Sequence, residues 1–260
     1  PGLTPLGHWA EVDVGIVTGR NAFFVLSSQQ VAELQASSHV VPIVGRTSAL
    51  RTTRFGRTEF SEYSARHPSY ILNLNGIPEH LIPPFLQEYI RSGEREGVHL
   101  GYKCRVRKRW FDVPSIYIPD AFLYRQIHRY PLMAVNEAQA TSTDTIHRVR
   151  LKAGVDNRLL ATALFNSLTL AWTEVCGRSY GGGVLELEPT EAEELLVCYD
   201  PNLQLDVEKV ETLLRTDRAH EALDYVDEVV LQDFCGLDRG TTIQLRTAWE
   251  TLRDRRINRK

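Results

Sequence analysis

The sequence lacks the features of a membrane or secreted protein. No run of about eighteen apolar residues occurs, so no transmembrane helix is predicted. The opening stretch PGLTPLGHW has no basic region and no apolar core, which excludes a signal peptide. The chain does not begin with methionine, and we expect it to begin inside a longer protein or after processing. These absences favour a cytoplasmic protein without a membrane partner.

Motifs of metal, redox and hydrolytic enzymes are also missing. The cysteines Cys104, Cys176, Cys198 and Cys235 form no CxxC pair, which argues against a zinc ribbon or a redox motif. Four cysteines in 260 residues do not predict a disulfide framework, so a reducing compartment is expected. The eight histidines show no HExxH spacing, and no GxSxG occurs. The sequence therefore predicts no catalytic residue and no bound metal.

The composition that remains is that of a globular protein. Apolar residues make up 43% of the chain and charged residues 24%. A chain of 260 residues suits one large domain with a small appendage. The sequence Asp200-Pro201-Asn202 reads as a linker, and the pattern beyond it is purely helical. We therefore predict a main domain over 1–202 and a helical tail over 203–260.

Charge is distributed unevenly along the chain. The formal net charge is −3, yet residues 91–150 contain eleven Lys or Arg and six Asp or Glu, a local net of +5. A local basic patch is typical of a phosphate-binding face, but charge alone favours an ordinary solvated surface.

Hydrophobic periodicity predicts an α/β fold, with a twisted mixed or antiparallel sheet, packed helices and a small helical tail. Strands are expected at 39–44, 69–74, 113–118, 131–135, 145–151 and 184–187. Helices are expected at 84–94, 156–175, 206–215, 218–234 and 241–256. The helix 156–175 has the clearest apolar stripe, so we expect it to be the main core helix, with Leu168 and Trp172 buried.

The first turn candidate is Thr18-Gly19-Arg20-Asn21, which separates two short β-rich runs, 12–17 and 22–26. Gly and Asn tolerate positive φ, so this pattern predicts a hairpin. The hairpin tip could present Arg20 and Asn21 to a ligand, and an ordinary turn explains the pattern equally well.

The strongest local feature is the segment 102–111, YKCRVRKRWF. If the segment is extended, alternate side chains share a face, so four cations would form a comb suited to phosphates. The neighbouring aromatic side chains could stack on bases or sugars. A basic edge strand that prevents aggregation is the alternative. The candidate residues here are Lys103, Arg105, Arg107, Lys108, Arg109 and Trp110.

Two further patterns lie near the end of the main domain. Arg178, Ser179 and Tyr180 precede three glycines, Gly181–Gly183, which allow close approach of a phosphate or of another backbone segment. No Gly-Lys-Ser/Thr follows, so this is not a P-loop. The acidic run 186–194 suits a solvated helix face, with Thr190 as its cap.

Several phrases together resemble a known family. They are GIVTGRNAFFVLS, YKCRVRKRWFDVP, VNEAQATSTDTIHRV and LFNSLTLAWTEVCGRSYGGGVLELEPTEAEELLV, which span about 12–200 in the family's order. They resemble the carboxy-terminal target recognition region of adenine-specific DNA methyltransferases of the Eco57I and TaqI restriction–modification kind. The resemblance implies double-stranded DNA as the partner. The candidate DNA-binding residues, from this resemblance and the basic segment, are Thr18, Arg20, Asn21, Lys103, Arg105, Arg107, Lys108, Arg109, Trp110, Asn136, Thr143, His147, Arg178 and Tyr180.

The resemblance also implies a partner domain that this chain does not contain. The family's amino-terminal catalytic domain binds S-adenosylmethionine and carries an Asn-Pro-Pro-aromatic motif, whereas Pro83-Pro84 here follows Ile82. We therefore expect no cofactor in this chain, with S-adenosylmethionine implied for the absent domain, which would flip the adenine and methylate it. Asn136 could contact DNA or bond a turn backbone.

Two other functions remain open at this point. A protein-interaction module would use the basic segment 102–111 to bind an acidic partner, such as the 186–194 segment of another copy. A magnesium-dependent nuclease would need carboxylates such as Glu59, Glu62 or Asp112, although no motif groups them.

Overall fold

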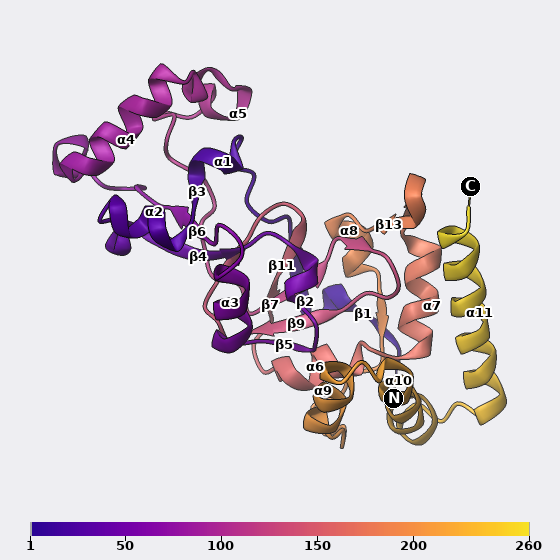
Figure 1. Cartoon of the computed structure of the whole chain (residues 1–260). Coiled ribbons are helices and arrows are strands. Elements are labelled where there is room, and N and C mark those ends of the chain that lie inside the picture. Colours follow the sequence, from indigo (N-terminus) through magenta and orange to yellow (C-terminus); the bar gives the residue numbers. More distant parts are fainter. Residues whose placement is uncertain (1, 260) are drawn as a thin grey trace.

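The computed structural model describes residues 2–259 and is built on a central five-stranded sheet (Figure 1). In spatial order its strands are β2 (Ala10–Asp13), β11 (Ile146–Leu151), β7 (Ala121–Tyr124), β9 (Met133–Asn136) and β5 (Arg54–Phe55). Neighbours run antiparallel except β5 and β9, which are parallel. Val149 lies opposite Val12 on one side and Ala121 on the other. This mixed sheet with packed helices confirms the predicted α/β class.

A second sheet supports the N-terminal half. Its order is β10 (Thr141–Ser142), β4 (Val40–Val44), β6 (Tyr70–Leu72) and β3 (Val25–Leu26). The predicted hairpin between 12–17 and 22–26 is wrong, because β2 pairs with β11 while β3 pairs with β6. Asn21–Phe24 forms the short helix α1 instead, and Phe23 and Phe24 are buried there in the local core.

Two small antiparallel sheets complete the strands. One has the order β12 (Arg178–Tyr180), β13 (Val184–Glu186) and β8 (Gln126–Ile127), and the other pairs β1 (Thr4–Pro5) with β14 (Leu196–Val197). The strand predicted over 113–118 is wrong. Pro114 cannot donate a ladder hydrogen bond and Ser115 has a φ of 61°, so this segment turns instead of pairing.

The helices lie around these sheets. The α-helices are α1 (Asn21–Phe24), α2 (Ser28–Glu33), α3 (Arg57–Ser64), α4 (Pro84–Arg95), α5 (Tyr102–Arg105), α6 (Asn157–Ala163), α7 (Ser167–Cys176), α8 (Pro189–Glu193), α9 (Val207–Arg215), α10 (Ala219–Val226) and α11 (Arg239–Ile257). The 3₁₀ turns are η1 (Leu6–His8), η2 (Ser37–His39), η3 (Thr47–Ala49), η4 (Glu79–Leu81), η5 (Val98–Leu100) and η6 (Gly181–Gly183), and η7 (Asp227–Phe234) is a π-helical segment that continues α10. Helix α4, with Pro84 in its first turn, confirms the prediction over 84–94.

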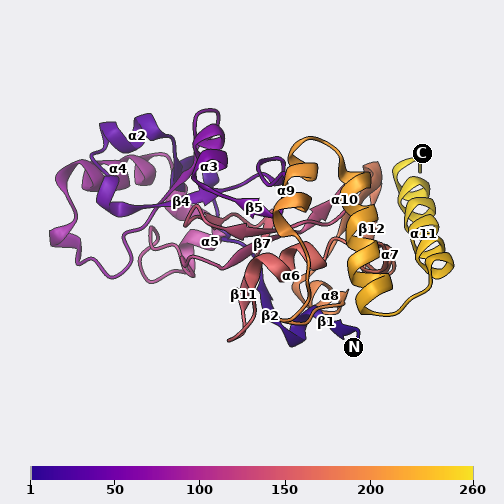
Figure 2. The same ribbon diagram turned by 90° about the horizontal axis from the view of Figure 1, so that it is seen from below.

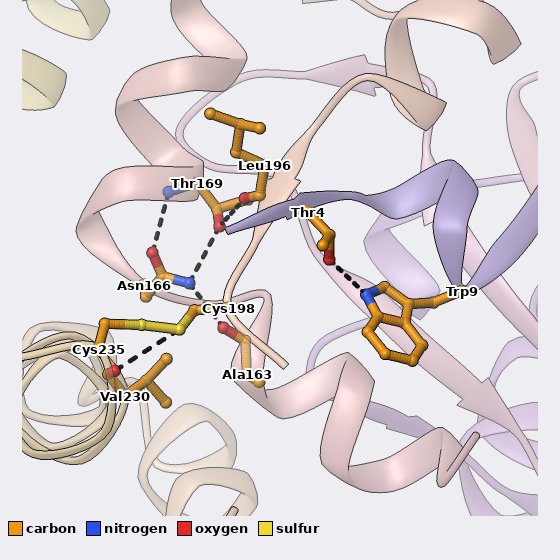
Figure 3. Close-up of a disulfide and its surroundings, with 9 residues drawn as sticks. All are labelled: Thr4, Trp9, Ala163, Asn166, Thr169, Leu196, Cys198, Val230 and Cys235. Carbon is orange, nitrogen blue, oxygen red and sulfur yellow. Dashed lines mark hydrogen bonds between the residues drawn. A yellow bond between two sulfur atoms is a disulfide. The ribbon is translucent and has the colours of Figure 1, made fainter. Parts of the chain in front are cut away.

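The predicted helix 156–175 is in fact two helices, α6 and α7, bent by 75°. Asn166 makes the break, because its side chain caps α7 by accepting from Thr169 N (2.9 Å) and donates to Ala163 O (2.7 Å) (Figure 3). The bend moves Trp172 off the buried stripe, and it is 36% exposed. Leu168 is half-buried, whereas Leu170 is fully buried. The prediction of two buried anchors was therefore wrong for Trp172.

The tail helices follow the prediction closely and pack on the main body. Figure 2 shows α9 and α10 over α6 and the sheet, and α11 beside α7. Leu160, Leu170 and Val197 of the main body share one apolar cluster with Leu223 and Leu231 of the tail. No single helix within residues 2–259 is long and apolar enough to cross a membrane, and only the bent, largely buried pair α6 and α7 reaches that composition.

A disulfide joins Cys198 to Cys235 (Figure 3). The sequence predicted no disulfide framework, and it did not indicate this single pair. Cys198 follows β14 and Cys235 ends η7, and the packing of the tail on the main body brings the two together across 37 residues of sequence.

Candidate nucleic-acid interface

The turn at Thr18-Gly19-Arg20-Asn21 is held by its own side chains. The Thr18 hydroxyl donates to Asn21 Oδ1 (2.5 Å) and accepts from Arg20 N (3.1 Å). Gly19 has a φ of 87°, and a Cβ there would lie 2.8 Å from the Lys103 Cβ. Thr18 is buried, whereas Arg20 and Asn21 are exposed. The turn therefore packs directly against the basic segment and points Arg20 outward.

The basic segment is not an extended comb. Tyr102–Arg105 forms α5, and the next residues turn again, with Arg107 N donating to Cys104 O (3.1 Å). Gly101 begins this helix and Cys104 is buried, so the chain coils around an inward anchor. The predicted alternation of cations along one face was wrong for this reason.

Arg107 and Arg109 bind the protein itself. Arg107 donates to the carbonyls of Val17 (3.2 Å) and Thr18 (2.8 Å), and its guanidinium lies over the Phe24 ring. Burial lowers the pKa of Arg107. Arg109 pairs with Asp112 (2.7 Å) and donates to two backbone carbonyls. These two arginines join the segment 102–111 to neighbouring loops rather than facing solvent.

Trp110 is also structural. Its ring packs among Phe23, Phe24 and Phe111, and its Nε1 donates to Glu94 (3.2 Å). The aromatic side chains next to the cations therefore build a small core, and only Tyr102 among them stays largely exposed.

Of the cations in the turn 18–21 and the segment 102–111, four are exposed and make no ion pair with a carboxylate among the described residues. We call this set the basic corner, and its members are Arg20, Lys103, Arg105 and Lys108. Figure 1 shows α1 and α5 next to each other in the upper part of the N-terminal half. A hollow of about 740 Å³ adjoins the corner and is lined by the loop 13–17 and by Lys103, Val106 and Lys108. The corner can offer several positive charges to one polyanion.

Arg148 is a residue of this site that the sequence did not flag. It is 2% exposed and donates to Asp13 Oδ2 (2.8 Å), Val14 O (2.8 Å) and Ser115 O (2.6 Å), with the Tyr117 ring 4.0 Å from its guanidinium. It ties the two loops that line the hollow. In the sequence Arg148 alternates with Val149 as the exposed Arg150 does, so the pattern does not distinguish this buried arginine from one that faces solvent.

Asn136, Thr143 and His147 are buried between the sheets. The Asn136 amide donates to Pro119 O (2.8 Å) and Ala140 O (2.7 Å), the backbone role considered as its alternative. Thr143 pairs with Thr145 and lies against Ile16. His147 Nε2 lies 2.7 Å from Leu187 O, and burial lowers the pKa of this histidine. These side chains position the loops around the hollow and do not reach its surface.

Arg178 and Tyr180 lie on the exposed edge strand β12. Arg178 pairs with Glu191 (2.6 Å), and Tyr180 is 51% exposed. Nothing lies within 4 Å of a Cβ built on Gly181 or Gly182, whereas one on Gly183 would meet the α11 backbone at Ile257 (2.9 Å). In Figure 1 the β13 hairpin and α5 both lie along the upper side, with β11 between them. Two exposed structures therefore share one side of the molecule.

The acidic run 186–194 is not a solvated face. Arg125 pairs with Glu186 (2.9 Å) and Glu188 (3.0 Å), and it lowers the pKa of Glu188. Glu193 accepts from Val12 N (2.8 Å). Glu188, not Thr190, caps α8. These carboxylates are used inside the fold.

The described residues do not group into the metal site that a magnesium-dependent nuclease would need. Within residues 2–259 no three His, Cys, Asp or Glu side chains group to hold a metal. Glu59 pairs with Arg215 and Asp112 with Arg109. The Gly181–Gly183 turn is open at Gly181 and Gly182, and Gly183 packs against Ile257 of α11. The chemistry that the surface supports is anion binding.

Known proteins are similar to this chain in sequence. The family model described as "Type II methyltransferase M.Eco57I, C-terminal domain" matches residues 1–231. Type II methyltransferase M.AccI of Acinetobacter calcoaceticus is 22% identical over 196 residues, which cover 73% of this chain and 35% of that protein. The family match thus continues past residue 200 into the helical tail.

Two solved structures share the fold. The type IIG restriction endonuclease BpuSI matches with a TM-score of 0.56 and 15% identity, over 98% of this chain and 31% of that one. The type IIL restriction-modification enzyme MmeI, solved in complex with DNA, matches with a TM-score of 0.52 and 11% identity, over 96% of this chain and 36% of that one. The chain spans about a third of the length of these relatives.

Proposed function

Because the chain belongs to the family of C-terminal domains of the type II methyltransferase M.Eco57I, we propose that it binds duplex DNA at the target sequence of a restriction–modification methyltransferase. The observation that carries this proposal is the basic corner. Its cations have no carboxylate partner among the described residues. The loops around them are held by Arg107, which donates to Thr18 O, and by Arg148, which donates to Asp13. Phosphates are the counter-charges that such a surface suits.

The second part of the proposed interface is the β12–β13 hairpin. Tyr180 stands beside two glycines that leave open space, so a base or sugar could approach its ring closely. Arg178 would have to exchange Glu191 for the DNA. Of the predicted residues, Arg20, Lys103, Arg105, Lys108, Arg178 and Tyr180 would contact DNA, and the others would position them.

The methyl transfer itself would belong to another part of the protein. A domain outside this chain would bind S-adenosylmethionine and methylate an adenine taken out of the duplex. The proposed place of action is the cytoplasm, where bacterial DNA lies.

The test is fluorescence anisotropy of the chain with a pool of randomised duplexes at increasing salt. We expect binding that falls steeply with salt, and enrichment of one short sequence. Arg105→Gln should reduce the salt slope by about one. The matched control is Arg91→Gln, which removes an exposed arginine on α4 that already pairs with Glu88. It should leave the salt dependence of binding unchanged.

Other outcomes would change the conclusion. Equal effects of the two variants would show that the basic corner does not contact phosphates. No binding at low salt, together with salt-sensitive self-association, would favour the protein-interaction module instead. The structure gives that alternative little support, because the acidic run 186–194 is occupied by Arg125, Arg178 and the Val12 amide.

A further inference from the structure

The corner that carries the cations also exposes large apolar side chains. Tyr102 is 67% exposed and Leu100 is 66% exposed, the highest values among the large apolar residues of 2–259. Val106, on the rim of the neighbouring hollow, is 63% exposed. Such a group of exposed apolar side chains is costly in water and marks a contact site.

These side chains are held outward by a tightly built backbone. Gly97, with a φ of 72°, begins η5, and Gly101 begins α5 directly afterwards. Val98 and Cys104, one in each turn, are buried in the core of the N-terminal half. The two turns therefore point their anchors inward while Leu100 and Tyr102 project from the corner.

The charge around the corner indicates what covers it. Lys103 follows Tyr102 directly, with its Nζ 5.8 Å from the centroid of the Tyr102 ring, and Arg105 lies in the same short helix. Lys108 lines the same hollow as Lys103, and Arg20 follows Gly19, which packs against Lys103. None of these four cations has a carboxylate partner among the described residues. Of the acidic groups near the corner, Asp112 pairs with Arg109 and Glu94 accepts from Trp110, whereas Glu96 is exposed and makes no ion pair among the described residues. Leu100 and Tyr102 are thus apolar side chains beside unpaired cations. Such a surface suits a polyanion that has apolar faces between its charged groups.

Resting on the proposed function, we infer that Leu100 and Tyr102 form a wedge that enters a base step of the bound duplex. Stacked bases are the apolar faces of DNA, and the phosphates on either side of the step would meet Lys103 and Arg105. Insertion unstacks the step and kinks the DNA. The cost depends on the step, so flexible pyrimidine–purine steps are favoured without any base-edge hydrogen bond.

The test uses duplexes of the enriched sequence with 2-aminopurine placed at successive positions, whose fluorescence rises when the base unstacks. With the 260-residue chain, we expect a rise confined to one step. Tyr102→Ala and Leu100→Ala should abolish the rise and weaken binding about 5- to 100-fold, the range of one lost base–aromatic contact. Both side chains are exposed, so these variants should fold like the parent.

Phe85→Ala is the matched control, because Phe85 is 53% exposed on α4 and lines neither of the hollows that the free cations line. It should leave both fluorescence and affinity unchanged. A duplex with a mismatch at the responsive step, already partly unstacked, should bind the parent chain more tightly and Tyr102→Ala no more tightly than matched DNA.

The outcomes separate the wedge from the proposed function. Salt-dependent DNA binding without any fluorescence rise, or with a rise that Tyr102→Ala and Leu100→Ala preserve, would overturn the wedge and leave DNA binding standing. Absence of DNA binding at low salt would overturn both. Weaker binding of these variants to a separately produced catalytic domain, with unchanged DNA affinity, would assign the corner to a protein contact.

Discussion

At the scale of single residues, the arginines of the basic segment divide into two kinds. Arg107 and Arg109 donate to backbone carbonyls of distant loops, whereas Arg105 faces solvent. A guanidinium can serve either role, because its five donors suit carbonyls as well as phosphates. The difference lies in which carbonyl groups the fold brings within reach.

This division predicts opposite effects of neighbouring substitutions. Arg107→Ala should lower the free energy of unfolding by about 2–3 kcal/mol, because it leaves the carbonyls of Val17 and Thr18 without their donor. Arg105→Ala should change stability by less than about 0.5 kcal/mol and weaken DNA binding. Urea unfolding and anisotropy on both variants measure this. Similar stability losses in the two would contradict the assignment.

His147 predicts a pH dependence of stability. Burial lowers its pKa in the folded chain, aided by nearby Arg125. As pH falls below about 6.5, the unfolded chain takes up the proton first, so the free energy of unfolding falls until the folded pKa is reached. Above about pH 6.5 the histidine is neutral in both states, so it no longer makes stability depend on pH.

The measurement compares the parent chain with His147→Gln, whose amide can still donate to Leu187 O. Urea unfolding at pH 7 and pH 5 should show a larger loss of stability for the parent. An equal loss in both proteins would place the titrating group elsewhere.

At the scale of elements, the break between α6 and α7 shows how one buried polar residue redirects a helix. The apolar periodicity over 156–175 suits one continuous helix. The Asn166 side chain instead replaces the backbone bonds of the interrupted turn, and Thr169 adds a bond to Leu196 O (2.7 Å) (Figure 3). The bend decides which side chains of α7 enter the core.

We predict that Asn166→Ala lowers the free energy of unfolding by about 2–3 kcal/mol, because a helix cap is lost and the Ala163 carbonyl loses its donor. Leu170→Ala should cost about 3–5 kcal/mol. Trp172→Ala should cost only about 1–2 kcal/mol, since the ring is partly exposed. Denaturant unfolding ranks the three, and a larger cost at Trp172 than at Leu170 would contradict the bend.

At the scale of the whole molecule, the helical tail and the main body share one core. Arg256 of α11 and Glu174 of α7 form an ion pair at 2.6 Å, each with a side chain only 4% exposed. Arg256 also donates to the carbonyls of Gly183 and His128. The division at residue 202 remains a prediction about how the parts fold.

We expect one cooperative unfolding transition for residues 1–260. Arg256→Ala should lower the free energy of unfolding by about 3–5 kcal/mol, because Glu174 would be left buried without a partner. The exposed neighbour Arg255→Ala should have little effect. Tryptophan fluorescence and circular dichroism should report the same transition. Two transitions, with only one shifted by Arg256→Ala, would show that the tail folds separately.

The sequence by itself determined the α/β class, the helices of the tail, the cationic segment 102–111 and the resemblance to DNA methyltransferase recognition regions. Each depends on local spacing, composition or continuous phrases. The tertiary structure alone decided that Arg105 is free and Arg107 is bound, that Asn136 and His147 are buried, and that Leu100 and Tyr102 project beside free cations. These outcomes depend on carbonyls and side chains distant in sequence, whose positions local periodicity does not encode.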